Sequence, residues 1–402
     1  MSTSRPPSKP TDAGSVGLVT PRQLEVFSAA QPLQLEGGET LGPITVQYET
    51  YGRLNAARDN AVLVCHALSG DAHAAGYLHS DDPAPGWWDT MIGPGKAFDT
   101  REYFIISTNI LGGCKGTTGS LSPDPRTGKP YGTAFPLVTI HDMVEVQKAL
   151  VDQLGIPKLL AVTGGSMGGM QALEWAVSFP DRLASVIPIA TTHRLSAQGI
   201  AFNEVGRQAI FADPHWNGGN YYDGPGPDSG LALARMIGHI TYLSEKSMHV
   251  KFGRNLRNRD RYAFNFETEF QVESYLHHQG QKFIQRFDAN TYLYITKAMD
   301  YYDLAAGHPS LRASLKRSAA KFMLIAFSSD WLFPPHDMKD IANALRANGS
   351  DVTYMVMQSD YGHDAFLLET EGLTKAIAAF LRCQRQTARP AARGKEAHHG
   401  HD

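Results

Sequence analysis

Short apolar runs alternate with helical patterns along most of the chain. Five such runs each lead into a loop of small or reactive residues, and they span residues 61–65, 103–107, 159–163, 322–327 and 353–357. This alternation predicts a mostly parallel sheet with crossover helices. Because ligands bind beyond the carboxyl ends of the strands in such sheets, we expect the five loops to meet at one edge.

The pattern changes between residues 193 and 311, where strand-like runs give way to amphipathic helical segments. This change predicts a helical cap inserted into an α/β core, which is made of residues 23–192 and 312–383. The two ends, residues 1–22 and 384–402, are expected to be disordered tails because they are rich in small and polar residues. His398, His399 and His401 lie in the second tail, where we expect solvation rather than metal binding.

A serine stands at the centre of a glycine-rich turn. The stretch GGSMG at residues 164–168 matches the G-x-S-x-G pattern of a nucleophile elbow, in which the serine is strained and the glycines avoid clashes. A glycine turn with a capping serine is the alternative. The elbow is favoured because the stretch directly follows an apolar run and directly precedes a good helix-forming segment, so we predict that Ser166 is the nucleophile.

A serine hydroxyl needs a base to remove its proton. In the α/β-hydrolase fold the chain order is Ser, then Asp or Glu, then His. Asp330 follows the fourth apolar run and His363 lies in a late loop. Asp337 and Asp340 are alternatives, but their helical pattern is typical of solvated positions. The chain is therefore predicted to have an α/β-hydrolase fold, with His363 as the base for Ser166 and Asp330 orienting the imidazole.

An acyl-transfer site also needs two backbone N–H groups as an oxyanion hole. One is expected from Met167, directly after the nucleophile, and the other from Leu68, in the loop after the first apolar run.

Several other patterns suggest chemistry less strongly. Residues 112–119 look like a phosphate-binding loop, but their spacing fits neither common motif, so we interpret them as a tight loop at the active edge. His66, Asp71 and His73 lack metal-site spacing, and no metal is expected. A basic run in the cap is interpreted as a solvated face or as an attractor for an anionic cosubstrate; it consists of Lys251, Arg254, Arg257, Arg259 and Arg261.

Composition excludes some partners and compartments. A net charge of −3 does not favour nucleic acid as a partner, and no apolar stretch is long enough for a membrane helix. The N-terminus lacks the apolar region of a secretory signal. The three cysteines form no CxxC pair, which fits a reducing cytoplasm.

Four segments carry a resemblance to a known family. NILGGCKG at residues 109–116, GGSMGGMQALEW at 164–175, AFNEVGRQ at 201–208 and DAN at 288–290 together resemble the homoserine O-acetyltransferase family. The similarity runs from roughly residue 33 to residue 381 and includes the cap.

This resemblance implies a transferase of methionine biosynthesis that uses acetyl-CoA as a cosubstrate and no further cofactor. Acetyl-CoA would acylate Ser166, CoA would leave, and the γ-hydroxyl of L-homoserine would take the acyl group in a ping-pong scheme. It also implies that Arg235 binds the homoserine carboxylate, that Asp364 binds its ammonium group, and that two copies of the chain pair through the cap.

The acyl donor depends on one position. Family members that use succinyl-CoA resemble one another in having Arg two residues after the catalytic aspartate, and this chain has Leu332 there. Leucine cannot neutralise a succinyl carboxylate, so acetyl is favoured over succinyl. A plain serine esterase on the same scaffold is a second alternative, because exclusion of water by the cap decides between the two reactions. A non-enzymatic binding module is a third, although no triad member is missing.

Overall fold

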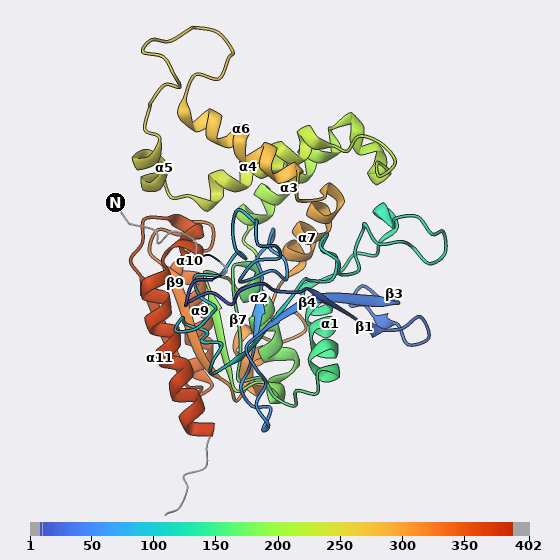
Figure 1. Ribbon diagram of the computed structural model, residues 1–402, viewed down its shortest axis with the longest axis vertical. Helices are drawn as coiled ribbons and strands as arrows, with labels where there is room; N and C mark the ends of the chain where they lie inside the picture. The colour runs from blue at the N-terminus through green and yellow to red at the C-terminus, as the bar shows by residue number, and fades with distance from the viewer. Residues whose placement is uncertain (1–8, 10, 389–402) are drawn as a thin grey trace, which may run out of the picture.

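An eight-stranded sheet forms the centre of the computed structural model, which describes residue 9 and residues 11–388 (Figure 1). The strand order is β1-β4-β6-β5-β7-β8-β9-β10. At one edge β4 runs antiparallel to both of its neighbours, β1 and β6. The strands from β6 onward in this order run parallel to one another. The strands are β1 (Arg22–Phe27), β4 (Ile44–Tyr51), β5 (Ala61–Cys65), β6 (Phe104–Thr108), β7 (Ala161–Gly165), β8 (Ser185–Ile189), β9 (Lys321–Phe327) and β10 (Val352–Met357); β2 (Leu33–Gln34) and β3 (Thr40–Leu41) form a separate pair.

Helices cover both faces of the sheet. One face packs against α1 (Ile140–Gln153), α2 (Met167–Ser178) and α9 (Pro335–Ala347). The other packs against α11 (Thr370–Ala388) and the long loop between β5 and β6. The central strands are therefore apolar on both sides, as in parallel sheets generally, and β5 is buried at every position. The short elements are α8 (Leu311–Ser314), α10 (Ala365–Leu368) and the 3-10 turns η1 (Gly132–Ala134), η2 (Pro180–Arg182), η4 (Leu315–Arg317) and η5 (Gly362–Asp364).

Five strands lie where apolar runs occur in the sequence, with bounds that shift by up to two residues. No equivalent apolar run predicts β1, β4 or β8. β8 contains Pro188, a residue that normally argues against a central strand, yet it pairs with β7 and β9 on its two sides. From Ile44 to Tyr48, β4 alternates between buried and partly exposed positions because one of its faces is only partly covered there.

The ordered part of the chain extends past the boundaries that were predicted for both tails. Leu18 pairs with Tyr77, and Val16 and Val19 pack against the core, so the structure corrects the expectation of disorder up to residue 22. The packing of these apolar side chains against the core accounts for the difference. At the other end α11 continues to Ala388, past the predicted boundary at residue 383. The histidines of the second tail lie outside the described residues.

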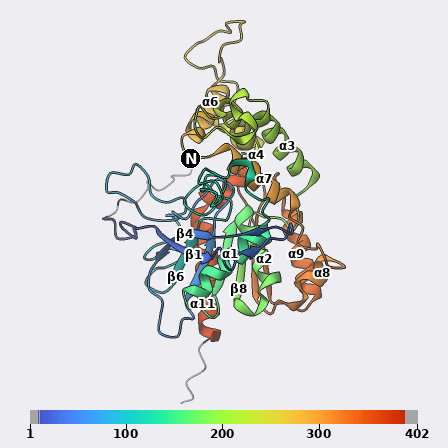
Figure 2. The ribbon, with the colours of Figure 1, turned by 90° about the vertical axis from the view of Figure 1, so that its right-hand side faces the viewer.

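A helical cap covers the carboxyl ends of the parallel strands (Figures 1 and 2). It contains α3 (Ala197–Phe211), η3 (Pro214–Gly219), α4 (Asp228–Tyr242), α5 (Glu245–Lys251), α6 (Gln271–Ile284) and α7 (Ala289–Tyr301).

The two crossings between the core and the cap lie side by side. Arg194 forms a bridge with Asp303, and the Leu304 N–H donates to the carbonyl of His193 at 2.8 Å. The chain returns from the cap a few residues before the predicted boundary at residue 311.

No helix in the described part of the chain is long and apolar enough to cross a bilayer.

Candidate active site

Ser166 occupies the sharp turn between β7 and α2. Its φ is 59°, a left-handed conformation that is costly for a residue with a side chain. The neighbouring glycines make the turn possible, because a Cβ at Gly164 or Gly168 would lie 2.5 or 2.1 Å from the carbonyl oxygen of Cys65. The turn therefore presents the serine side chain at the carboxyl end of the sheet, as the glycine pattern predicts.

Three residues from distant parts of the chain meet at this turn. The Ser166 Oγ lies 2.7 Å from the Nε2 of His363, and the Nδ1 of His363 lies 2.8 Å from the Oδ2 of Asp330. The other Asp330 oxygen accepts the N–H groups of Leu332 and Phe333, both at 3.0 Å. These bonds fix the carboxylate, and the carboxylate fixes the imidazole with Nε2 facing the serine.

The electrostatics suit a base at the centre of this array. Burial by itself lowers the pKa of His363, but the charge and hydrogen bond of Asp330 outweigh it and raise that pKa above its usual range. The competing carboxyl group of Asp337 lies instead in the first turn of α9, where burial raises its pKa and Thr192 hydrogen-bonds to it.

A cavity between the core and the cap opens onto the serine. Leu68, Ser166 and Leu332 line it from the core side. The cap lines it with side chains of α3, α4 and α7, among them Phe202, Ile237, Tyr242 and Tyr292. Met167 begins α2 and is fully buried. The role of the Leu68 and Met167 N–H groups as an oxyanion hole stays a prediction.

Comparison with known proteins agrees with this geometry. Residues 60–370 match the model of the alpha/beta hydrolase fold family. A homoserine O-acetyltransferase of Methanosphaerula palustris is 58% identical over 368 residues, which cover 92% of this chain and 74% of that protein. A homoserine O-succinyltransferase of Magnetococcus marinus is 54% identical, covering 91% of this chain and 95% of that protein.

Solved structures are similar as well. The crystal structure of a homoserine O-acetyltransferase from Bacillus anthracis superposes with a TM-score of 0.84 at 30% identity, covering 90% of this chain and 98% of that one. The chain belongs to the homoserine O-acetyltransferase family. The same scaffold occurs in esterase E22, at a TM-score of 0.82 and 33% identity over 90% of this chain and 100% of that one.

Two charged side chains that the family resemblance singled out lie near the triad. Arg235 of α4 places its guanidinium 4.6 Å from the ring of Phe283 and 5.6 Å from that of Tyr242, with Nη1 3.4 Å from the Oγ of Ser69. Burial raises the pKa of Asp364, although the nearby charges of His363 and Arg235 oppose it. Within the described residues neither Arg235 nor Asp364 forms a side-chain ion pair, although the charge of Arg235 acts on Asp364, next to the catalytic histidine.

Tyr242 is a site residue that the sequence analysis missed. Its ring centroid lies 6.1 Å from that of His363, and its side chain lines the cavity. The available signal was its place two turns after Arg235 on the same face of α4, but that spacing alone does not identify a site residue.

The remaining sequence candidates make contacts within the core, and the Asp71 carboxylate accepts the His73 N–H at 2.9 Å. His66 accepts the Ile110 N–H through Nε2, whereas His73 pairs with Glu49. Within the described residues no group of three or more His, Cys, Asp or Glu side chains is arranged to hold a metal ion. The glycine-rich residues 112–119 run beside β4, where the Thr118 N–H donates to a backbone carbonyl of that strand.

The basic run lies at the outer end of the cap. Lys251 ends α5, with its Nζ 4.3 Å from the ring of Tyr275. The four arginines that follow it lie on the segment between α5 and α6, which projects from the cap (Figure 1).

Proposed function

We propose that this protein transfers the acetyl group of acetyl-CoA to the γ-hydroxyl of L-homoserine, a step of methionine biosynthesis, through an acyl-Ser166 intermediate. The observation that carries the proposal is the 2.7 Å contact between Ser166 and His363 below a cavity roofed by the cap. Asp364 directly follows that histidine, and the charge of Arg235 acts on Asp364. The covalent scheme needs an activated serine, and the recognition of homoserine needs one cation and one anion at a fixed separation.

His363 acts as the proton carrier in both halves of the reaction. It takes the Ser166 proton as the hydroxyl attacks the thioester carbonyl, and the imidazolium then protonates the departing CoA thiolate. In the second half His363 takes the proton of the homoserine γ-hydroxyl, and the oxygen of that hydroxyl attacks the acyl-serine ester. His363 returns that proton to Ser166. Asp330 stabilises the imidazolium in each half, and the N–H groups of Leu68 and Met167 stabilise the oxyanion.

Substrate recognition divides between the cap and the core. The Arg235 guanidinium suits the homoserine carboxylate because it offers two parallel N–H donors. Asp364 suits the ammonium group, since a buried carboxylate near the catalytic base gains a cation when the substrate binds.

Acetyl-CoA is the donor favoured by the residues around the serine. Leu332 lines the cavity that contains Ser166, and no cation stands at that position. A succinyl carboxylate would lie there without a partner, at a desolvation cost. Homoserine O-succinyltransferase activity is the alternative, since one similar relative bears that name.

An esterase is the second alternative, because triad geometry does not choose between water and an alcohol as acceptor. The decisive test measures thiol release from acetyl-CoA with and without L-homoserine, together with mass spectrometry of the product. We expect fast release and O-acetylhomoserine only when homoserine is present. Equal release in both samples would refute the transferase and support an esterase. Ser166→Ala serves as the blank for both.

We further propose a cytoplasmic homodimer joined through the cap. Of the sixteen large hydrophobic side chains that are exposed in the described residues, ten lie between residues 193 and 311, although that stretch is less than a third of the chain. A concentration of exposed apolar side chains in one part of a protein is typical of a region that meets a partner. Sedimentation of the purified protein should give twice the chain mass; a monomer at micromolar concentration would contradict the dimer.

A further inference from the structure

The loop that follows β5 carries Leu68 and is anchored to the core at its first residue. The Nε2 of His66 accepts the backbone N–H of Ile110 at 3.2 Å, so the ring proton is on Nδ1. That Nδ1 lies 2.7 Å from the carbonyl oxygen of Ala67 and donates to it. Burial lowers the pKa of His66, which keeps the ring neutral and this tautomer in place.

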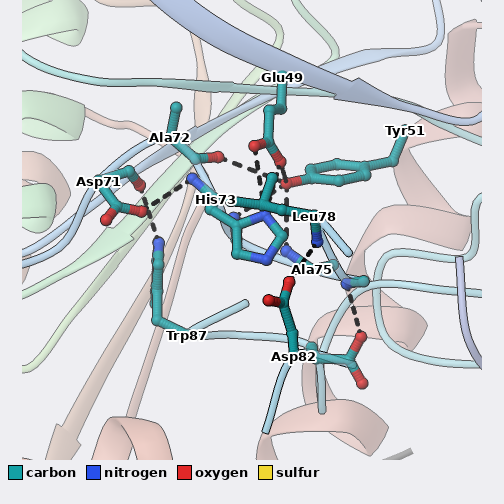
Figure 3. A network of polar contacts seen from close by, with 12 residues as sticks. Glu49, Tyr51, Asp71, Ala72, His73, Ala75, Leu78, Asp82 and Trp87 are labelled. Atoms are coloured by element: carbon teal, nitrogen blue, oxygen red, sulfur yellow. Dashed lines mark hydrogen bonds and ion pairs between the residues drawn. The ribbon is translucent and has the colours of Figure 1, made fainter. Parts of the chain in front are cut away.

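The first part of this loop, residues 66–75, is held at its other end by a second set of core contacts (Figure 3). The Tyr51 hydroxyl accepts the N–H groups of Ala74 and Ala75 at 2.9 and 3.1 Å and donates to the buried Glu49 carboxylate at 2.6 Å. His73 pairs with the same carboxylate at 3.1 Å. The loop is therefore fixed to the core on both sides of the turn that contains Leu68.

One residue of the cap holds the main chain in the middle of the loop, whereas Arg235 reaches only the side chain of Ser69. Arg286, which follows α6, donates from Nη1 to the carbonyl oxygen of Ser69 at 2.9 Å. Among the hydrogen bonds of the described residues, it is the one that joins a cap side chain to the main chain of residues 66–75. The guanidinium lies 5.3 Å from the ring of Phe283, which is buried and stacked on Phe287.

This contact reaches Leu68 through two peptide groups. Arg286 binds the carbonyl of the Ser69–Gly70 peptide, and the N–H of that same peptide donates to the Ala67 carbonyl at 2.9 Å. The Ala67 carbonyl shares its peptide group with the N–H of Leu68. Since hydrogen-bonded groups in series polarise one another, a cation at the start of the series strengthens the donor at its end.

We propose that Arg286 is a positioning residue for the oxyanion hole, orienting and polarising the Leu68 N–H through the Ser69–Gly70 and Ala67–Leu68 peptides. The inference rests on the proposed role of Leu68 as an oxyanion donor. It gives the cap a part in the chemistry as well as in recognition, because a cap residue begins the donor series.

The test compares Arg286→Met, Arg286→Lys and the matched control Lys282→Met, which removes an exposed cation from α6. Single-turnover acylation of Ser166 is measured with acetyl-CoA and with p-nitrophenyl acetate, a neutral ester that needs no phosphate contact. We expect Arg286→Met to slow acylation about tenfold or more with both donors, since loss of a whole oxyanion donor costs about a hundredfold. The lysine variant should recover part of the rate, the control should match the native protein, and the KM for homoserine should change less than about twofold.

Two results would overturn the proposal. Ester acylation within twofold of the native rate in Arg286→Met would show that the contact does not act on the oxyanion hole. A loss confined to acetyl-CoA would make Arg286 a ligand of the anionic donor instead. A simple ester reports acylation of Ser166 whatever the natural acceptor is. If Arg286→Met slows ester acylation but the native protein transfers no acetyl group to homoserine, the proposed function is refuted and the role of Arg286 is not. If Arg286→Met does not fold, the comparison of Arg286→Lys with the native protein decides, because a point charge keeps one donor but loses the guanidinium plane.

Discussion

In the core, Ser166, Asp330 and His363 all follow the carboxyl ends of strands, whereas Arg235 and Tyr242 of the cap lie on one face of a single helix. Strand ends are fixed by the backbone hydrogen bonds of the sheet. The nucleophile therefore lies 2.7 Å from the base, and the base lies 2.8 Å from the aspartate. The cap residues are placed by helix packing, with aromatic contacts of 4.6 to 5.6 Å. The difference suggests that the core carries the bond-making steps and that the cap selects what reacts.

Removal of the nucleophile is expected to have the largest effect. Ser166→Ala keeps a Cβ at the strained turn and should fold like the native protein. Turnover should fall by more than about a thousandfold, since a triad serine acts as a unit with its base. Steady-state thiol release measures the loss, and thermal unfolding checks the fold. Retention of a tenth of the rate would place the nucleophile elsewhere.

Changes at Arg235 sharpen the contrast between chemistry and recognition. Arg235→Met should raise the KM for homoserine about ten- to a hundredfold, since a charged hydrogen-bonded pair contributes about 1.5–3 kcal/mol. Acylation by p-nitrophenyl acetate should change far less. Arg254→Met, another cap arginine, is the control. A loss of ester acylation as large as the change in KM would contradict the division between core and cap.

Leu332 tests donor choice from the core side. Leu332→Arg adds a cation to the cavity and should shift the ratio of succinyl-CoA to acetyl-CoA turnover by about fivefold, as expected for a partly solvated ion pair worth about 1 kcal/mol. Competition between the two donors gives the ratio directly. Leu332→Met, which stays apolar, should leave it unchanged; an equal shift in both variants would mean that size rather than charge decides.

The smallest effect is expected from a change in the core, remote from the cavity, that alters stability only. His141 of α1 hydrogen-bonds to Glu174 of α2 at 3.0 Å, and this contact raises the pKa of His141 from 6.5 to about 9. A raised histidine pKa means that the stabilisation is complete below pH 6.5 and is lost as the pH rises through about 9. His141→Asn should remove this dependence, with a difference in melting temperature of about one degree because the side chain is partly solvated. Parallel melting curves from pH 6.5 to 9.5 check it; an unchanged pH slope would refute the link.

Much of the core site is predictable from the sequence, and most of the cap site is not. The glycines around Ser166, and the positions of Asp330 and His363 after apolar runs, are local signals, because strained turns and strand ends depend on neighbouring residues. The contact of Arg286 with Ser69 joins residues 217 positions apart, and no spacing rule reveals it. Arg235 was assigned through family resemblance rather than from its helix. β8 was missed because its proline opposes the sheet pairing that its neighbours impose.

The paired crossings at His193 and Leu304 also bear on how such proteins diversify. Because the ends of the cap are already hydrogen-bonded neighbours, the core is closed whatever length of chain is carried between them. The entropic cost of closing a loop grows only slowly with its length, so a longer or shorter cap would change the stability of the core very little. The catalytic triad can thus be kept while the cap is replaced, and a change of acceptor requires no change in the strands of the core.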